Sequence, residues 1–382
     1  MDRCRHVRIP LASQQPGARK KCDWRGIYPR ISRRTLVVRI LVTGGAGFIG
    51  SNFVHQILRD HPSDHLVVLD KLTYAGNLHN LEAPLLDPRV QFVRLDVSDP
   101  AVAEIAKNCD AAVHFAAESH VDRSIEDATP FVRTNVEGTW RLIDACRAAG
   151  VSRFVHVSTD EVYGSLGPDE KSTESSPLAP TSPYAASKAA SDLLVLSAVK
   201  THGFPAIITR CTNNYGPFQF LEKFIPLMIS QALANQSLPV YGDGRNVRDW
   251  IHVSDHCRAV DLILRNGKEG EVYNIGGGCE LENITVARKI LKALDRPGSL
   301  LKLVTDRPAH DRRYALDCKK LKQELGWQPS CEFDRGLAET IRWYQENSVW
   351  LEETRSGDYQ KYFERHYVRR GETFASSFKN GM

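Results

Sequence analysis

The chain has 382 residues, enough for one large domain or two cooperating ones, and 42% of them are hydrophobic and 25% charged. This composition is typical of a soluble globular protein and excludes a mainly disordered chain. The formal net charge of +4 is small for this length. It argues against nucleic acid or an anionic membrane as the principal partner.

Hydropathy and cysteine usage narrow the class further. No uninterrupted apolar run is long enough to cross a bilayer. The nine cysteines are an odd number and lie far apart, without a C-x-x-C pair or the spacing of a metal site. We therefore expect reduced thiols, a cytoplasmic protein and no bound metal.

The first 35 residues differ from the rest, because they are rich in arginine and lysine and contain only Asp2 and Asp23 as acids. They lack the apolar segment of a secretory signal, although an organellar transit peptide has this kind of composition. A disordered basic extension, or a start assigned too far upstream, is the favoured interpretation.

From residue 36 onward, short β-branched runs alternate with longer amphipathic ones. We expect strands over 37–44, 65–70, 91–97, 111–117, 153–159 and 205–210, and helices over 48–59, 101–107, 132–149 and 184–201. Strands that alternate with helices predict right-handed βαβ units and a doubly wound parallel sheet with helices on both faces.

After residue 210 the alternation becomes irregular, with connections rich in glycine, proline and asparagine. We expect helices over 254–265, 285–294, 318–325 and 334–346 in a smaller α/β lobe. The predicted organisation is a basic extension (1–35), a nucleotide-binding domain (36–210), a mainly substrate-binding lobe (211–350) and a C-terminal extension (351–382). A cleft between domain and lobe is the expected ligand site.

The first predicted strand runs into the sequence TGGAGFIG, which opens a helix. Gly44 allows the tight turn, Gly47 lets the backbone approach a pyrophosphate, and Gly50 permits close packing of helix on strand. The amides at the start of the helix are then positioned to bind phosphate. A glycine triplet alone is weak evidence, because turns also collect glycine.

Asp70 strengthens this interpretation, because it ends the next strand at about the 20-residue distance expected of a ribose-binding acid. Together with the alternating elements, it predicts a Rossmann-type domain. A carboxylate here repels the extra phosphate of NADP, so we expect NAD. The adjacent Lys71 weakens that preference slightly.

The fifth predicted strand ends in STDEVYG, which places Asp160 beside Glu161. Two carboxylates at the end of a buried strand are costly, because like charges repel and desolvation penalises each. They are either solvated loop acids or part of a reaction centre. Consecutive residues of a regular strand point to opposite faces, so the chain must already turn here if both acids reach one ligand.

Downstream, the sequence PYAASK opens a helix and puts Tyr184 and Lys188 four residues apart on one face. A free tyrosine has a pKa of about 10 and is a poor base near neutrality. Lys188 and the positive nicotinamide of bound NAD can lower that pKa by proximity. The Tyr-x-x-x-Lys pattern is common by chance, but behind a dinucleotide loop it favours a base that removes a hydroxyl proton.

These motifs, in this order, resemble the extended short-chain dehydrogenase/reductase family: TGGAGFIG, the Asp70 acid, FAAESHVDRS and YAASK. The resemblance covers roughly residues 37–350. Within the family, STDEVYG, CTNNYGP, EKFIP, RDWIHVSDH and DRPAHDRRYALD are similar to the branch that dehydrates dTDP-glucose at carbons 4 and 6. CTNNYGP has threonine where that branch is expected to have serine, which keeps the hydroxyl.

The resemblance implies a hydro-lyase reaction with no net redox change. Tyr184 would take the 4-hydroxyl proton, with Thr159 orienting that hydroxyl and Lys188 supporting the phenolate. Glu161 would remove the C5 proton while protonated Asp160 donates to the departing C6 hydroxyl. The hydride removed from C4 returns to C6, and the product is dTDP-4-keto-6-deoxyglucose.

The resemblance also implies the binding residues. For NAD they are Gly44, Gly47, Phe48, Ile49, Gly50, Asp70, Lys71, Asp96, Val97, Ala116, Ala117, Tyr184 and Lys188. For the nucleotide sugar they are Asn213, Lys223, Arg248, Asn283, Arg313 and Tyr314. Ser119 and His120 follow the fourth predicted strand, and we expect them to line the sugar pocket near the nicotinamide. Arg248 is the favoured phosphate ligand, because guanidinium binds phosphate in a bidentate way.

Three alternatives stay open at this point. UDP-glucose could replace dTDP-glucose as the substrate of dehydration, or the enzyme could be a UDP-glucose 4-epimerase. A different class is an NAD-binding sensor without turnover, although a sensor needs no complete proton-transfer set.

Family members commonly pair through helices of the nucleotide-binding domain, so we expect a homodimer formed by segments 132–149 and 184–201.

Overall fold

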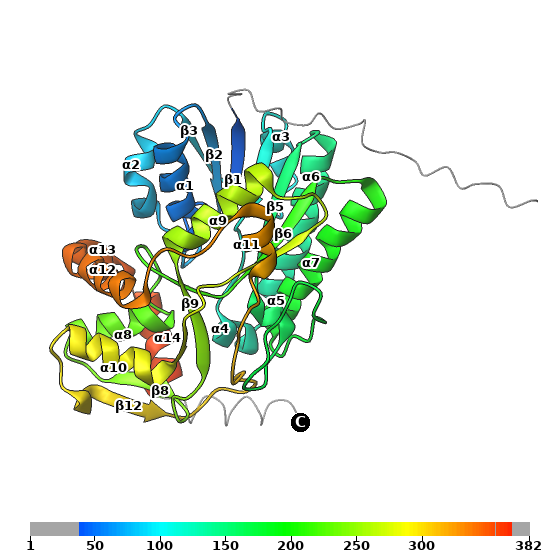
Figure 1. Cartoon of the computed structure of the whole chain (residues 1–382). Helices are drawn as coiled ribbons and strands as arrows, with labels where there is room; N and C mark the ends of the chain where they lie inside the picture. The colour runs from blue at the N-terminus through cyan, green and yellow to red at the C-terminus, as the bar shows by residue number, and fades with distance from the viewer. Residues whose placement is uncertain (1–37, 356, 369–382) are drawn as a thin grey trace, which may run out of the picture.

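The computed structural model of the chain describes residues 38–355 and 357–368 (Figure 1). The expectations for the basic extension and for the last residues of the C-terminal extension lie outside this part. Among the described residues, no helix is both long and apolar enough to span a membrane. The same residues contain no cluster of three or more His, Cys, Asp or Glu side chains suited to a metal ion.

A seven-stranded parallel sheet forms the centre of the molecule, in the order β3-β2-β1-β4-β5-β6-β10. Its strands are β1 (Arg39–Thr43), β2 (His65–Asp70), β3 (Val90–Arg94), β4 (Ala111–His114), β5 (Arg153–Thr159), β6 (Ala206–Cys211) and β10 (Val272–Ile275). The strand order reverses between β1 and β4, and ligands bind at the carboxyl ends of strands beside such a switch point. The predicted doubly wound plan is confirmed.

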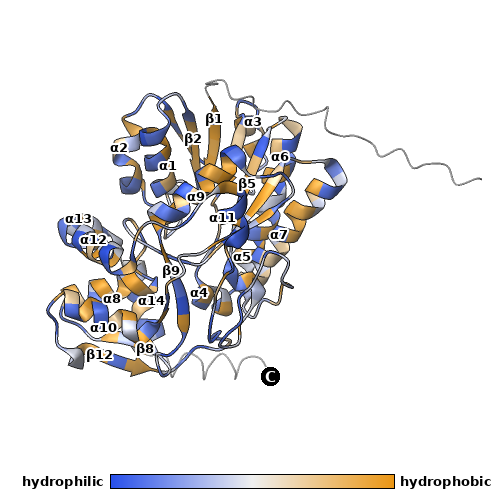
Figure 2. Cartoon of the chain, viewed as in Figure 1, coloured by the Kyte–Doolittle hydropathy of each residue, from blue (hydrophilic) through white to orange (hydrophobic). Residues whose placement is uncertain are grey.

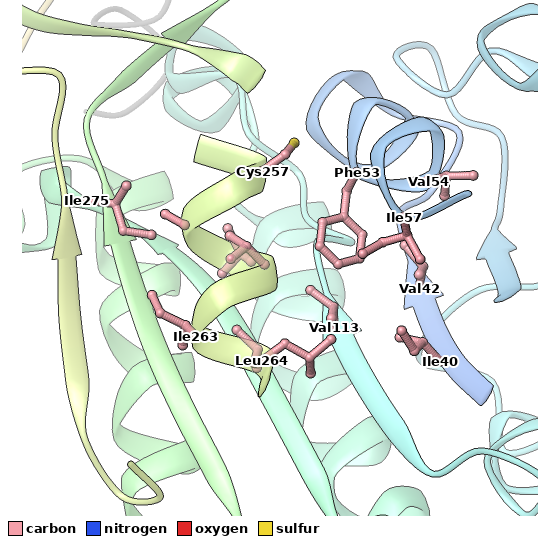
Figure 3. Packing of buried hydrophobic residues seen from close by; sticks show 14 of the residues in the cluster. Ile40, Val42, Phe53, Val54, Ile57, Val113, Cys257, Ile263, Leu264 and Ile275 are labelled. Carbon is pink, nitrogen blue, oxygen red and sulfur yellow. The ribbon is translucent and has the colours of Figure 1, made fainter. Parts of the chain in front are cut away.

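Helices cover both faces of the sheet, because successive strand residues point to opposite sides. Ile40 and Val42 pack with α1 (Phe48–Asp60), α9 (Val253–Asn266) and α11 (Lys319–Leu325), whereas Leu41 packs on the other side. Figure 3 shows the first of these cores, with side chains of α1 and α9 converging on β1 and β4. The opposite face carries α3 (Val102–Ala106), α6 (Thr139–Ala148) and α7 (Pro183–His202). Figure 2 shows most sheet strands in the hydrophobic colour.

The segment predicted as one helix over 132–149 is helical throughout, but its first part is a π-helix, η3 (Val132–Gly138), that continues into α6. The side-chain amide of Asn135 in η3 accepts the Glu118 N–H and donates to the Glu118 carbonyl, at 2.9 Å each. It also donates to Ser187 Oγ at 2.9 Å. The π-helix therefore ties the loop after β4 to α7, beside the pocket described below. Such bulges are frequent at functional sites.

The second half of the chain builds the smaller lobe but also returns to the sheet, since α9, α11 and β10 belong to the larger body. The lobe has its own core among α8 (Phe224–Leu233), α10 (Asn283–Ala293), α12 (Phe333–Glu346) and α13 (Ser348–Thr354). Helix α8 was not predicted, because it is apolar almost all round and lacks amphipathic periodicity. The strands here are β7 (Asn213–Tyr215), β8 (Leu238–Tyr241), β9 (Val247–His252), β11 (Glu280–Glu282) and β12 (Leu301–Val304).

Short elements complete the described chain. They are η2 (Leu78–Leu81), α2 (Glu82–Leu85), α4 (Val121–Glu126), α5 (Thr129–Phe131), η4 (Asp160–Tyr163), η5 (Gly298–Leu300), α14 (Gly357–Phe363) and η6 (Glu364–Val368). Helix α14 packs on the lobe, where Tyr359 and Tyr362 are buried. The described part of the C-terminal extension is thus bound to its own chain.

Candidate active site

A pocket opens at the carboxyl ends of β1, β2, β4, β5 and β6, where the larger body meets the lobe. Many of the expected site residues line it together: Gly44, Gly47, Phe48, Ile49, Gly50, Asp70, Lys71, Val97, Ala116, Ala117, Ser119, Thr159, Asp160, Glu161, Tyr184, Lys188, Asn213 and Lys223. Residues separated by up to about half the chain therefore share one cavity. Because the tertiary structure brings these residues together, we take the pocket as the candidate active site.

The glycine loop has the geometry expected of a dinucleotide site. Gly44 has φ +70°, and a Cβ there would lie 2.5 Å from the Ala116 nitrogen. A Cβ on Gly50 would lie 2.2 Å from the Gly44 carbonyl oxygen. Gly47 precedes α1 and provides no side-chain cap, so the first helical amides are not satisfied by a cap. The loop thus leaves donors and space suited to a pyrophosphate.

The ribose end of the pocket carries a negative local charge. Asp70 accepts the N–H of Ala46 at 3.0 Å and that of Leu72 at 2.8 Å. The Lys71 amine lies 3.5 Å from a carboxylate oxygen of Asp96 and 3.5 Å from one of Glu118. Because two carboxylates already oppose Lys71, its charge does not favour an additional phosphate, and the geometry fits NAD better than NADP.

The two adjacent acids reach the same pocket because the chain turns at the end of β5. Thr159 caps η4, and its hydroxyl accepts the Glu161 N–H at 3.3 Å and donates to Asp160 Oδ1 at 3.2 Å. Asp160 Oδ2 is buried and has no hydrogen-bond partner among the described residues. The turn required by the sequence argument is therefore present.

The surroundings separate the pKa values of the two acids. Burial, with Glu161 and Asp249 nearby, raises the pKa of Asp160 well above its usual range. Burial also raises the pKa of Glu161, but the cations Arg307, Lys223 and Arg248 oppose that shift. The pKa of Asp160 is thus raised more strongly than that of Glu161, which suits Asp160 as the acid and Glu161 as the base.

Tyr184 and Lys188 face the pocket from the first turns of α7, which Ser182 caps by accepting the Ala185 N–H at 3.2 Å. The Lys188 amine donates to the Val157 carbonyl at 2.8 Å. Burial, followed by the negative charge of Glu161, raises the pKa of Tyr184 well above its usual value. The lowering expected at Tyr184 is thus not produced by the protein groups alone, and the positive nicotinamide remains its expected source.

Three of the expected substrate residues line the pocket. Asn213 on β7 has a buried side-chain oxygen without a hydrogen-bond partner among the described residues. Lys223, just before α8, donates to the Ser119 carbonyl. These residues bring polar groups of the lobe to the edge of the acid pair.

His120 and Arg313 differ from the expectation. The His120 ring contacts the Glu222 carbonyl at 3.1 Å and packs on the Tyr362 ring at a centroid distance of 5.2 Å, instead of lining the pocket. Arg313 is engaged elsewhere, because it donates to Glu280 at 2.9 Å and to the Gly167 carbonyl at 2.7 Å. Both side chains connect parts of the fold.

Arg248, Tyr314 and Asn283 do not line the pocket, contrary to the expectation. The Arg248 guanidinium stacks 4.4 Å from the centre of the Tyr314 ring and donates to the Asp311 carbonyl at 2.9 Å. The positive charge of Arg248 still opposes the rise in pKa of both Asp160 and Glu161. Asn283 opens α10, and its buried side-chain oxygen has no hydrogen-bond partner in the described part of the chain.

Arg307 is a functional candidate that the sequence reasoning missed. Its side chain is 9% exposed, and its Nε lies 3.6 Å from Asp122. One terminal nitrogen is buried without a hydrogen-bond partner among the described residues, and Arg307 is the largest cationic influence on Glu161. Arg307 belongs to the motif DRPAHDRRYALD, from which only the later Arg313 was expected to bind the substrate.

Comparison with known proteins identifies the family. Residues 41–340 match the family described as GDP-mannose 4,6 dehydratase. This chain belongs to the GDP-mannose 4,6 dehydratase family. The expected relationship to extended short-chain dehydrogenases/reductases is thereby confirmed.

Individual relatives in the family are similar over most of their length. The chain is 52% identical over 327 residues to a dTDP-glucose 4,6-dehydratase of Streptomyces niveus, covering 84% of this chain and 97% of the relative. A crystal structure of a dTDP-glucose 4,6-dehydratase from Streptomyces venezuelae with NAD bound has a TM-score of 0.81 and 53% identity, covering 83% and 99%. A UDP-glucose 4-epimerase of Thermus thermophilus in complex with NAD has a TM-score of 0.75 and 30% identity, covering 81% and 99%.

Proposed function

We propose that the protein is an NAD-dependent dTDP-glucose 4,6-dehydratase, a hydro-lyase that forms dTDP-4-keto-6-deoxyglucose. The observation that carries the proposal is that the pair Asp160 and Glu161 shares one pocket with Tyr184 and Lys188. Asp160 is buried and Glu161 is half-buried, and the pKa of Asp160 is raised more strongly than that of Glu161. An epimerase oxidises C4 but needs no adjacent acid and base to remove water. Relatives near 50% identity bearing this name support the same conclusion.

The residues present fit NAD. The cradle that a Cβ would fill at Gly50, the uncapped start of α1 and the acid at Asp70 suit its pyrophosphate and ribose. When bound, NAD supplies the hydride acceptor at C4 and the hydride donor at C6. The protein contributes binding, orientation and proton transfer.

In this proposal, the described side chains handle the protons. Tyr184 takes the proton of the 4-hydroxyl, which Thr159 orients, and Lys188 stabilises the phenolate. Glu161 removes the C5 proton, which the new 4-ketone acidifies. Asp160 donates from its unpartnered oxygen to the C6 hydroxyl, which leaves as water, and Glu161 returns a proton to C5.

Mass spectrometry of protein incubated separately with dTDP-glucose and UDP-glucose tests this function. We expect dTDP-glucose to lose one water without added reductant. Water loss from UDP-glucose alone would keep the chemistry and replace the substrate. Galactose epimers without water loss would favour an epimerase, and NAD binding without any turnover would favour a sensor.

Arg307 and Arg248 provide positive charge for the nucleotide diphosphate. Because a hydrogen bond to a charged group contributes about 1.5–3 kcal/mol, Arg307→Gln or Arg248→Ala is expected to raise the KM for the sugar nucleotide about ten- to a hundredfold. Arg312→Gln is the matched control, since Arg312 is exposed and paired with Asp243. Steady-state kinetics and NAD titration measure both effects. An unchanged KM in the first two variants would remove those residues from the site.

We also propose a homodimer formed through η3, α6 and α7. Large apolar side chains are exposed on all three: Val132 at 55%, Trp140 at 39% and Leu193 at 58%. A second copy would remove this surface from water. Sedimentation is expected to give a dimer that Leu193→Glu weakens, and a monomer at working concentration would contradict the assignment.

A cytoplasmic location is proposed on the chemistry of the thiols. The seven described cysteines form no disulfide, and four of them are buried. This usage is typical of proteins kept in a reducing compartment.

A further inference from the structure

A cluster of buried polar side chains adjoins Lys188 and has no part in the reaction scheme above. It consists of His156 on β5, Ser191 and Asp192 on α7, and Arg210 on β6, all between 0% and 3% exposed. Buried ionic groups of this kind are costly unless each is compensated. The charges of this cluster act on the neighbouring Lys188 amine.

Hydrogen bonds determine the state of His156. The Ser191 hydroxyl donates to the Lys188 carbonyl at 2.8 Å, so it accepts in its 3.1 Å contact with His156 Nε2. Nε2 therefore carries the proton, and burial lowers the pKa of His156 to about 4, which leaves the ring neutral near pH 7. Although Nε2 lies 3.5 Å from the Lys188 amine, it cannot accept a proton from it.

With His156 neutral, the buried charges near Lys188 are two cations, Lys188 and Arg210, and one carboxylate, Asp192. Asp192 follows Lys188 by four residues and shares its helical face. Its Oδ2 accepts the Nε–H of Arg210 at 2.8 Å, while its Oδ1 lies 3.5 Å from His156 Nε2. The single carboxylate of Asp192 thus acts on two buried cations. It accepts a hydrogen bond from Arg210, and its negative charge acts on Lys188.

We propose that Asp192 is a positioning residue for the reaction: its carboxylate keeps the Lys188 amine protonated, and Arg210 limits this effect by competing for the same carboxylate. The inference rests on the proposed function, in which the charged amine stabilises the Tyr184 phenolate. Asp192 would not touch the substrate, but would act through Lys188.

The other titratable groups facing Lys188 do not replace Asp192. They are His114 on β4, His156 on β5, Cys211 on β6, Asp160 and Glu161 on η4, and Tyr184 on α7. Burial lowers the pKa of His114 well below its usual value and raises that of the Cys211 thiol to about 12, so both are neutral. Asp160 and Glu161 exchange protons during the cycle and are unchanged in the variants below.

The expected sign follows from the protonated amine being the active form. Burial lowers the pKa of Lys188 to about 8, and Asp192 is the largest opposing influence. Activity is lost as the pH rises through that value. Asp192→Asn is expected to move this alkaline limb of kcat/KM down by about one pH unit or more. Arg210→Gln is expected to move it up, because Asp192 then serves Lys188 alone, and Arg210→Lys, which keeps the charge, is expected to leave it near the parent value.

Two measurements test the proposal. One is kcat/KM for dTDP-glucose across pH, and the other is the ¹⁵N chemical shift of the Lys188 amine in NAD-free protein, assigned by its absence from Lys188→Arg. Opposite shifts in Asp192→Asn and Arg210→Gln would support the proposal, since loss of a structural contact alone gives no such pair. Limbs and titrations that stay in place, or move together, would overturn it.

The design separates failure of folding and of function from failure of the inference. Thermal unfolding identifies a variant that does not fold, and the Arg210 pair then decides without Asp192→Asn. If the parent protein leaves dTDP-glucose unchanged, the proposed function fails, while the amine titration still reports whether Asp192 holds the proton on Lys188.

Discussion

Asp160→Asn is expected to abolish water loss from dTDP-glucose while NAD binding is retained. Asparagine keeps the shape of the side chain but cannot deliver a proton to the C6 hydroxyl. General acid catalysis contributes about 10²–10⁴-fold, so kcat should fall by that factor. Because Asp160 Oδ2 lacks a hydrogen-bond partner among the described residues, the change breaks no contact there and stability should be little affected. Mass spectrometry measures product, and titration measures NAD affinity.

Glu161→Gln is expected to have an equally large effect for a different reason. Glutamine cannot remove the C5 proton, and the charge that Arg307 and Lys223 face is lost. Asp169→Asn provides the matched control, because Asp169 is an exposed acid a few residues beyond the pair. Near-normal turnover in either site variant would end the proposed roles, as would a comparable loss in the control.

Gly50→Ala is expected to impair both folding and cofactor binding. Its Cβ would lie 2.2 Å from the Gly44 carbonyl oxygen and 2.8 Å from the Gly45 Cα, which are backbone atoms that cannot rotate away. Overpacking of this kind costs about 1–3 kcal/mol, so the melting temperature should fall by several degrees. The displaced loop should also weaken NAD binding at least about tenfold.

Two other glycines separate these effects. A Cβ on Gly47 has one close neighbour, the Gly44 oxygen at 3.2 Å, and Gly47 lines the pocket. Gly47→Ala should therefore lower NAD affinity with little loss of stability. Gly298→Ala should change neither, because nothing lies within 4 Å of its Cβ. Calorimetry with and without NAD measures all three variants, and equal behaviour of Gly50→Ala and Gly298→Ala would refute the packing argument.

Local patterns were sufficient for six strands of the central sheet and for the dinucleotide loop, but not for the seventh strand, β10, which follows the irregular region after residue 210. The run from β1 through Gly50 combines a strand period, glycines at turn positions and a helix start, and each of these signals is carried by neighbouring residues. Helix α8 was missed, because a helix buried on most sides has no polar face to mark its period.

Side-chain partners in the lobe could not be obtained in the same way. The motif DRPAHDRRYALD contains several arginines, and their spacing does not reveal that Arg313 binds Glu280 whereas Arg307 reaches toward Glu161. His120 was expected in the pocket because it follows a strand end. The lobe and α14 instead supply its partners, the Glu222 carbonyl and Tyr362.

The sequence by itself determined the alternating α/β plan, the glycine loop with Asp70, and which residue types the proposed site offers, because these depend on residue type and short spacing. Only the tertiary structure showed which of the two acids has its pKa raised more strongly. Asp160 and Glu161 are adjacent in the chain, but Asp249 acts on Asp160, Arg307 and Lys223 act on Glu161, and Arg248 acts on both. Charge and burial act through space, so distant parts of the chain set the pKa values that neighbouring residues cannot set for themselves.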